Sequence, residues 1–356
     1  KSAYASFEKN EKLYRVNALF MPLLLLLVGS STLIAVWIGG EGVIEGRLSP
    51  GVIAEFIFYV NLLTWPIASI GWVMSMVQRA EASMERINDF LKINPEIMDK
   101  ENVVIPKSIK GSIEFRNVSY TYPESKKRAV INLSMKILSG ETVVIVGKTG
   151  AGKSTLVSLI NRLMDPVEGD IFIDDEDIKN WQIEKLRQSI GTVPQDPFLF
   201  SDSISDNIAF GTSEALLKDI NFYADIANLT DDIQGFSKGL DTVVGERGIT
   251  LSGGQKQRLS IARALIKKPK IVLFDDALSS VDTDTESKIL LALKTQLDSV
   301  TTIIVTQRLS AVHLADRILV FDEGQLVQQG THIDLLKESG IYSELYNLQN
   351  PENWKE

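Results

Sequence analysis

The sequence predicts an all-α transmembrane part followed by an α/β domain built on a parallel sheet. Two long stretches without a charged side chain lie within residues 1–80. After them, short runs of apolar, β-branched residues that suit buried parallel strands alternate with helical patterns. One of these runs leads into a glycine-rich loop that opens a helix. We therefore expect membrane helices first and a soluble domain of strand–loop–helix units after them.

The composition excludes several classes of protein and of site. The 356 residues are enough for two domains, and the net charge of −9 argues against a general nucleic-acid-binding protein. The chain has no cysteine, so disulfides, cysteine-based zinc sites and a thiol nucleophile are excluded. Any histidine chemistry depends on His313 and His332, because the chain has two histidines.

Two segments are predicted to span a lipid bilayer, at about residues 16–40 and 52–78. The first carries no charged residue, and the second carries none from Phe56 to Gln78. About 20 apolar residues in a helix suffice to cross the hydrocarbon core. A buried core helix of a soluble protein is the alternative, but such helices are usually shorter and packed among other elements.

The charges around the two spans predict their orientation. Basic residues gather at the outer ends of the spans: Lys1, Lys9, Lys12 and Arg15 before the first, and Arg79, Arg86 and Lys92 after the second. The turn between the spans holds one basic residue, Arg47, against Glu41 and Glu45. The positive-inside rule then places both outer ends in the cytoplasm. We expect a multi-pass protein of the cell membrane (plasma or inner) with its soluble domain in the cytoplasm.

Polar residues interrupt the second span. Asn61, Thr64 and Pro66 lie in it, and polar groups at such depth either face a helix bundle or water path, or bond their own backbone. Two spans alone make a poor pathway. We therefore expect oligomerisation or further spans upstream of Lys1.

A glycine-rich loop follows the predicted strand 142–146. Its residues are Gly147, Lys148, Thr149, Gly150, Ala151, Gly152, Lys153 and Ser154, and Thr155 continues into a helix. Strand, loop and helix in this order predict a P-loop nucleotide-binding domain. Glycines let backbone N–H groups face phosphate oxygens, and the helix N-terminus adds partial positive charge. Lys153 is expected to bind the outer phosphates, and Ser154 to bind Mg²⁺.

Polar side chains also follow three other predicted strands. Gln195 follows 190–194, Asp275 and Asp276 follow 270–274, and Gln307 follows 302–306. Asp275 is placed to hold Mg²⁺ with Ser154, since carboxylate oxygen is a ligand that Mg²⁺ prefers. Gln195 is expected to reach the Mg²⁺ or the attacking water.

A second phosphate clamp is predicted at Leu251-Ser252-Gly253-Gly254-Gln255, ahead of the helical stretch 256–266. A serine and two glycines at a helix start form an anion site. Spacing alone does not decide whether both clamps serve one nucleotide.

In this order, these motifs resemble the nucleotide-binding domain of ABC transporters, from Ile113 to about Tyr346. The resemblance assigns Tyr122 to base stacking. It also includes the loop Ser279–Asp282, and Thr242–Gly248 looks like a segment that is typical of exporters. It implies ATP as the nucleotide, an antiparallel β edge and a helical subdomain at about 200–265. The two spans look like the fifth and sixth of a six-span exporter domain.

The resulting domain plan has four parts. Residues 1–98 form the end of a transmembrane domain, with a cytoplasmic helix at 79–93. Residues 99–111 form a linker, 112–346 the ATP-binding domain and 347–356 a C-terminal tail.

The resemblance also implies a head-to-tail dimer, in which each ATP lies between the phosphate loop of one domain and the LSGGQ of the other. Two positions depart from the family pattern. Asp276 stands where the general base is Glu, and Gln307 stands where a histidine contacts the γ-phosphate end. A carboxylate one methylene shorter is misplaced by about 1.5 Å, and about 1 Å can cost a hundredfold in rate. We therefore expect a degenerate site of this chain, and a heterodimer in which its intact LSGGQ completes the partner's hydrolytic site.

Other interpretations stay open at this point. The chain is either a half-exporter of this kind, a slow homodimeric ATPase exporter, or a nucleotide-gated regulator or pore with negligible turnover. A soluble repair or chromosome ATPase is disfavoured by the two spans. Drug-like amphiphiles, lipids and peptides are all compatible with the apolar spans as exported substrate.

Overall fold

The computed structural model describes residues 2–349, apart from 107, 213, 246–250 and 297–298. The chain divides into two compact units, residues 1–94 and 95–356. The predicted exporter-type segment lies partly outside the described residues, because 246–250 are among the gaps.

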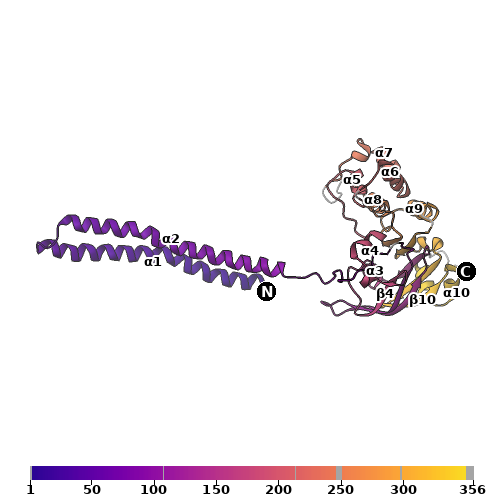
Figure 1. The fold of residues 1–356 in the computed structure, drawn as a ribbon, viewed down its shortest axis with the longest axis horizontal. Coiled ribbons are helices and arrows are strands. Elements are labelled where there is room, and N and C mark those ends of the chain that lie inside the picture. Colours follow the sequence, from indigo (N-terminus) through magenta and orange to yellow (C-terminus); the bar gives the residue numbers. More distant parts are fainter. Residues whose placement is uncertain (1, 107, 213, 246–250, 297–298, 350–356) are drawn as a thin grey trace. The chain divides into compact units, whose positions relative to one another are not determined.

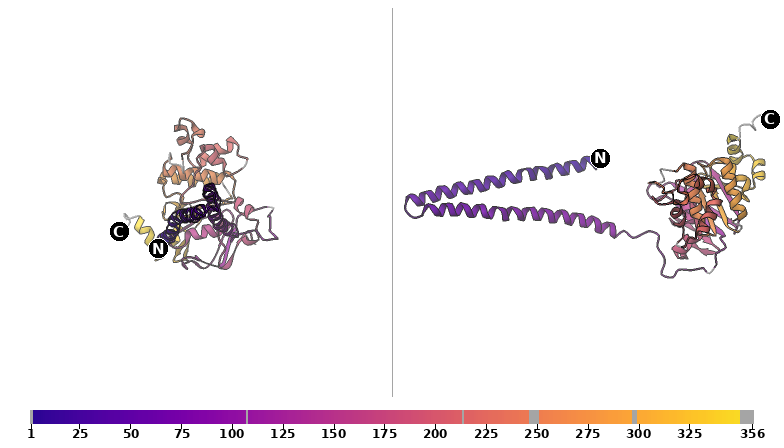
Figure 2. Two further views of the ribbon diagram at one scale, coloured as in Figure 1. Left: turned by 90° about the vertical axis from the view of Figure 1, so that its left-hand side faces the viewer. Right: turned by 90° about the horizontal axis from the view of Figure 1, so that it is seen from above.

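The first unit is a helical hairpin of α1 (Ser2–Ile44) and α2 (Pro50–Leu91), which Figures 1 and 2 show as two long helices joined by one turn. Pro50 starts α2, where its missing N–H costs no hydrogen bond. Near the turn the helices approach closely: a Cβ added to Gly39 would lie 2.7 Å from Cγ1 of Ile53. Small residues of this kind allow close helix packing.

Both helices have the length and hydropathy to cross a membrane. The candidate spans are Ala18–Ile44, with a mean hydropathy of 2.3, and Pro50–Leu91, with 1.5, and their most apolar stretches are not buried within the structure. The polar residues of the second span bond their own helix. Asn61 Nδ2 donates to the Ile57 carbonyl at 2.9 Å, and Thr64 Oγ1 donates to the Val60 carbonyl at 2.7 Å. Their hydrogen bonds therefore need no partner helix.

The second unit contains a six-stranded sheet and a four-stranded antiparallel sheet. The larger sheet has the order β10 (Gln325–Gly330), β9 (Arg317–Asp322), β3 (Thr142–Gly147), β8 (Thr301–Val305), β7 (Ile271–Asp275), β6 (Ile190–Val193). The smaller sheet has the order β2 (Arg128–Ile137), β1 (Ile113–Thr121), β4 (Glu168–Ile173), β5 (Glu176–Asp177). In the larger sheet, β10 pairs antiparallel with β9, and the other pairs are parallel.

The helices of this unit are α3 (Lys153–Ile160), α4 (Ile183–Ser189), α5 (Ile204–Ala209), α6 (Leu217–Ile226), α7 (Thr230–Gly235), α8 (Gly253–Ile266), α9 (Thr283–Gln296), α10 (His332–Lys337) and α11 (Ile341–Gln349). Figure 1 shows α5, α6, α7 and α8 grouped together, away from β4 and β10. These helices lie in the part of the chain where the sequence predicts a helical subdomain, at about residues 200–265.

Alternation along the strands of the larger sheet creates two cores, because successive side chains of a strand face opposite sides. Val144 and Val146 of β3 pack with α8 and α9, while Val143 and Ile145 pack with α3 and the smaller sheet. Helix α3, which follows the phosphate loop, is therefore held between the two sheets. This packing fixes the helix N-terminus at the edge of the larger sheet.

The segment that the sequence predicts as a linker is hydrogen-bonded to residues 180–183 of the second unit. Asp99 Oδ1 accepts from the Ile183 N–H at 2.8 Å, and the Val104 N–H donates to the Asn180 carbonyl at 2.7 Å. Lys100 Nζ adds a bond to Asn180 Oδ1 at 2.8 Å. The start of the predicted linker is thus docked along 180–183.

Candidate nucleotide-binding site

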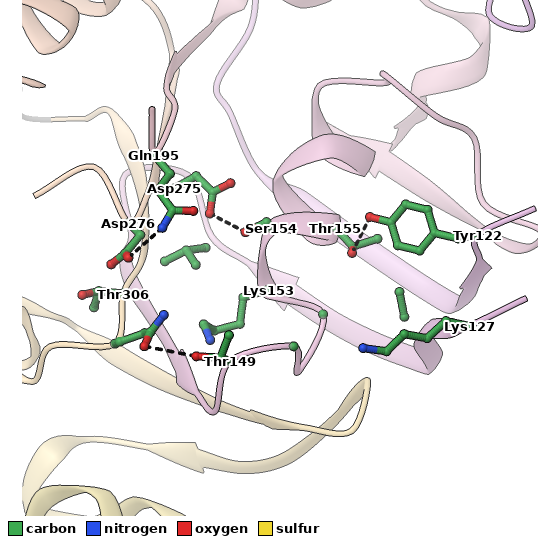
Figure 3. Close-up of a pocket in the computed structure, with 15 residues that line it drawn as sticks. Tyr122, Lys127, Thr149, Lys153, Ser154, Thr155, Gln195, Asp275, Asp276 and Thr306 are labelled. Carbon is green, nitrogen blue, oxygen red and sulfur yellow. Dashed lines mark hydrogen bonds between the residues drawn. The ribbon is translucent and has the colours of Figure 1, made fainter. Parts of the chain in front are cut away.

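The carboxyl ends of parallel strands meet along one edge of the larger sheet. The loops after β3, β7 and β8 and the residues just beyond β6 leave the sheet there, since β3 pairs with β8, β8 with β7 and β7 with β6, all in parallel. A cavity of about 290 Å³ opens at this edge. Its lining residues are Tyr122, Lys127, Ala129, Thr149, Gly150, Gly152, Lys153, Ser154, Thr155, Gln195, Asp275, Asp276, Val305, Thr306 and Gln307 (Figure 3).

Two glycines of the loop lie so close to the backbone of neighbouring strands that a side chain does not fit at their positions. Gly152 has a φ of +97°, and a Cβ there would lie 2.0 Å from the Ala129 carbonyl oxygen. A Cβ on Gly147 would lie 2.1 Å from the Phe321 carbonyl oxygen of β9. Glycine therefore lets the loop turn directly from β3 into α3 against two other strands. This is the geometry in which backbone N–H groups can surround a phosphate.

Lys153 is buried inside the loop. It is 7% exposed, and its Nζ donates to the carbonyls of Gly147 at 2.7 Å and Lys148 at 3.0 Å. Burial lowers the pKa of Lys153, and the charges of Asp276 and Asp275 act against that shift. A desolvated ammonium next to the loop is suited to bind an anion, because phosphate oxygens would replace the missing water.

Ser154 and Asp275, which the sequence predicts to hold Mg²⁺ together, form a hydrogen-bonded pair. Ser154 Oγ donates to Asp275 Oδ1 at 2.7 Å. Burial raises the pKa of Asp275, while the Ser154 bond and the Lys153 charge lower it. A hydroxyl and a desolvated carboxylate side by side fit the oxygen-ligand chemistry of Mg²⁺.

Asp276 and Gln195 lie on the opposite side of Lys153 from Tyr122 (Figure 3), and Gln307 lines the same cavity. Gln195 Nε2 donates to Asp276 Oδ2 at 3.4 Å, and Thr149 Oγ1 donates to Gln307 Oε1 at 3.3 Å. Both bonds are long for N–H···O and O–H···O geometry. Asp276 has a φ of +49°, which Asp tolerates better than most residues. Burial raises the pKa of Asp276, against hydrogen bonding by the Gln307 backbone and the charge of Lys153.

Tyr122 lies at the other end of the cavity. Its Oη is 3.1 Å from Thr155 Oγ1, and its ring contacts Tyr120 edge-on with centroids 5.1 Å apart. Tyr120 is buried and belongs to the apolar core that includes the smaller sheet. Tyr122 is half-buried and borders the cavity, so its ring is available to a ligand.

The second predicted clamp lies elsewhere. The described residues that line the cavity do not include Ser252, Gly253, Gly254 or Gln255. Ser252 instead caps α8, its Oγ accepting from the Gln255 N–H at 3.2 Å while Gln255 Oε1 accepts from the Ser252 N–H at 2.9 Å. This is a complete capping box. Ser252 and Gly253 remain exposed at the helix start.

Lys127 lines the cavity, although the sequence did not single it out. Its side chain extends from the Tyr122 side toward the glycine loop (Figure 3), and a Cβ on Gly150 would lie 3.5 Å from its Nζ. The Tyr122 N–H donates to the Lys127 carbonyl at 3.0 Å and closes the turn that places Lys127 beside the cavity. The run Lys126-Lys127-Arg128 shortly after Tyr122 was the available signal, but it reads equally as a solvated turn.

Comparison with known proteins identifies relatives of this chain. A family model described as ABC transporter matches residues 130–279. The uncharacterized ABC transporter ATP-binding protein YfiB of Bacillus subtilis (strain 168) is 40% identical over 96% of this chain and 59% of its own length. The multidrug resistance-like ATP-binding protein MdlA of Escherichia coli (strain K12) is 39% identical over 97% of this chain and 58% of its own.

A solved structure extends the comparison to the fold. The structure of a bacterial Atm1-family ABC exporter with ATP bound aligns with a TM-score of 0.81 at 36% identity, covering 93% of this chain and 58% of that chain. The chain thus spans less than two thirds of the length of these relatives. Because the family model falls on the domain with the cavity and the relatives match nearly the whole chain, the chain belongs to the ABC transporter family, with an ATP-binding domain that follows a transmembrane part.

Proposed function

We propose that this chain is the ATP-binding half of an exporter. It binds ATP in the cavity at the edge of the larger sheet, pairs with a second half-transporter and couples ATP binding and hydrolysis to outward transport. The observation that carries the proposal is the joint placement of the glycine loop, Lys153, Ser154 and Asp275 around one cavity. The hairpin would sit in the cell membrane as part of a multi-pass domain, with the ATP-binding domain in the cytoplasm.

Each part of the cavity has a proposed role. Tyr122 stacks on the base, and the backbone from Gly147 to Thr155 and the Lys153 ammonium bind the phosphates. Ser154, Asp275 and Gln195 would hold Mg²⁺, which supplies charge neutralisation on the phosphates. Asp276 and Gln307 occupy the end where the γ-phosphate and the attacking water would lie.

The site of this chain is proposed to hydrolyse ATP poorly. Asp276 is shorter than the Glu found in the family pattern, and it is engaged by Gln195 only at 3.4 Å. Gln307 carries no proton that it could release at physiological pH, and its amide oxygen is already bonded by Thr149. Asp276 therefore differs from the family pattern in length, and Gln307 differs from it in charge.

The LSGGQ of this chain is proposed to act on a partner. The capping box fixes the start of α8, and Ser252 and Gly253 are exposed outside the chain's own cavity. A head-to-tail dimer would bring this helix start against the ATP held by a second phosphate loop. We therefore favour a heterodimer whose partner carries Glu and His at the two altered positions.

The test compares binding with turnover on the full-length chain. We expect the protein to bind Mg²⁺–ATP, to retain it mainly as uncleaved ATP and to show negligible turnover alone. Lys153→Ala should abolish that binding, while Lys148→Ala serves as a control for a loop lysine outside the cavity lining. Strong turnover by the chain alone would contradict the degenerate site and support a homodimeric exporter.

Adding a partner half-transporter extends the same test. We expect hydrolysis to appear only in the mixed assembly and to be lost in Ser252→Asp of this chain. Lys153→Ala of this chain should leave the partner's hydrolysis partly active. Equal loss from both substitutions would contradict the division of labour between the two sites.

A further inference from the structure

The segment that carries Gln307 is held by the C-terminal helix α11. Gln349, at the end of α11, uses both atoms of its side-chain amide on this segment. Its Nε2 donates to the Gln307 carbonyl at 2.6 Å, and its Oε1 accepts from the Leu309 N–H at 3.1 Å. One side chain thus fixes the backbone on both sides of Arg308.

A second contact holds the far end of the same segment. His313, in the 3-10 helix Ser310–Leu314, packs edge-on against His332 with ring centroids 4.8 Å apart. His332 Nδ1 lies 2.6 Å from the hydroxyl of Tyr342, a fully buried residue of α11. The C-terminal helices therefore contact the segment at Gln307 and again at His313.

The opposite side of the segment is tied to the loop that follows Asp276. Arg308 donates to the carbonyl of Val281 at 2.8 Å and also bonds the carbonyl of Ser279. Ser310 Oγ donates to the buried Glu286 at 2.9 Å. The segment that begins at Gln307 is thus held by α11 on one side and by the loop after Asp276 and the start of α9 on the other.

Ordinary packing of a terminal helix explains part of this arrangement but not Gln349. Tyr342 and partly buried Ile341, Leu345 and Tyr346 attach α11 to the apolar core. Gln349, in contrast, is polar and exposed. Its two hydrogen bonds act on the backbone next to Gln307, and that residue lines the cavity through its side chain.

We propose that Gln349 is a positioning residue for Gln307, so that α11 sets the γ-phosphate end of the ATP site. The inference rests on the proposed function, because it assigns that end of the cavity to the γ-phosphate. ATP and ADP differ by this one group. Loss of Gln349 should therefore weaken ATP binding and leave ADP binding unchanged.

The test is a double-mutant cycle on the full chain, with dissociation constants for Mg²⁺–ATP and ADP measured by displacement of a fluorescent nucleotide. We expect Gln349→Ala and Gln307→Ala each to lower the preference for ATP over ADP by about three- to tenfold, the effect of one hydrogen bond. Combining the two should give no further loss, since Gln349 acts only through Gln307. Asn347→Ala, an exposed amide in the same helical turn, is the matched control and should change nothing.

A second variant separates positioning from folding. Gln349→Glu keeps an acceptor for the Leu309 N–H but places a carboxylate against the Gln307 carbonyl, so it should behave like Gln349→Ala at an unchanged melting temperature. Additive losses in the cycle, equal losses for ATP and ADP, or an effect of Asn347→Ala would overturn the inference. Failure of the wild-type chain to bind either nucleotide would instead overturn the proposed function.

Discussion

At the scale of single residues, two lysines reach the cavity from different depths. Lys153 is buried within the loop, and its hydrogen bonds go to loop carbonyls. Lys127 is exposed and approaches Gly150 from the side of Tyr122. The first ammonium is part of the loop structure, and the second is free to follow a bound ligand. Their contributions to binding should therefore differ in size and in salt dependence.

Lys127→Gln is expected to weaken binding of ATP and ADP alike by about two- to fivefold, the range for an exposed charge pair. The equal effect follows from its position between Tyr122 and the loop, away from the γ-phosphate end. The loss should shrink at high salt, because exposed charges are screened. Lys126→Gln, which does not line the cavity, is the control in the same binding assay. A loss confined to ATP would contradict this placement.

Residue chemistry was partly predictable from sequence. The polar residues at the ends of β7 and β8 could be predicted to meet, because strand tips of a parallel sheet share an edge. Gln349 could not be connected with Gln307, because that contact joins residues 42 positions apart through a terminal helix. Lys127 was equally inaccessible, since a basic turn has the same composition whether or not it faces a ligand.

At the scale of elements, α8 combines a structural and a proposed binding role in one residue. Ser252 satisfies the helix N-terminus through the capping box, and it is exposed where a partner's phosphate would approach. These roles depend on different properties of the side chain. Capping needs a hydrogen-bond acceptor, while a phosphate contact needs the absence of negative charge.

Substitutions at Ser252 should separate the two roles. Ser252→Ala removes the cap and is expected to cost about 1 kcal/mol of stability. Ser252→Asp retains a good cap and should keep the melting temperature, yet it should abolish hydrolysis in the mixed assembly through charge repulsion. Thermal unfolding and ATPase assays on the same samples decide the matter. Full activity of Ser252→Asp would show that this helix start meets no phosphate.

Among the elements, three buried strands of the larger sheet were predicted well from their apolar runs, and one strand of the smaller sheet was missed. The apolar runs of β3, β7 and β8 appear as parallel strands close to the predicted bounds. Strand β2 was not predicted, although residues 132–137 alternate polar and apolar side chains as a half-buried strand does. Its pairing with β1 is set by the tertiary fold. The helix α8 begins at Gly253 rather than 256, since the glycines of the clamp already belong to its first turn.

At the scale of the whole molecule, the hairpin and the ATP-binding domain have opposite surface chemistry. Most of the apolar side chains of α1 and α2 that the structure describes are exposed within it, and those of the second unit form two cores. A lipid bilayer would cover the hairpin. The proposed orientation then places the turn around Glu45 outside the cell and Glu85 inside.

Cysteine labelling can test this orientation cleanly, because the chain has no cysteine of its own. Glu45→Cys should react with a membrane-impermeant maleimide on intact cells. Glu85→Cys, on the part of α2 that is proposed to lie in the cytoplasm, should react only after the membrane is opened. The reverse pattern would contradict the proposed topology, and labelling of both on intact cells would contradict membrane insertion of the hairpin.

The central claim is that Asp276 and Gln307 separate ATP binding from hydrolysis in this chain. The most direct measurement is the ATPase rate of Asp276→Glu/Gln307→His beside the wild type, because two copies with intact LSGGQ could then complete each other's sites. We expect turnover to rise by at least about a hundredfold at similar ATP affinity, and Lys153→Ala in the same background to remove it. Unchanged turnover in the double variant, with ATP still bound, would contradict the claim.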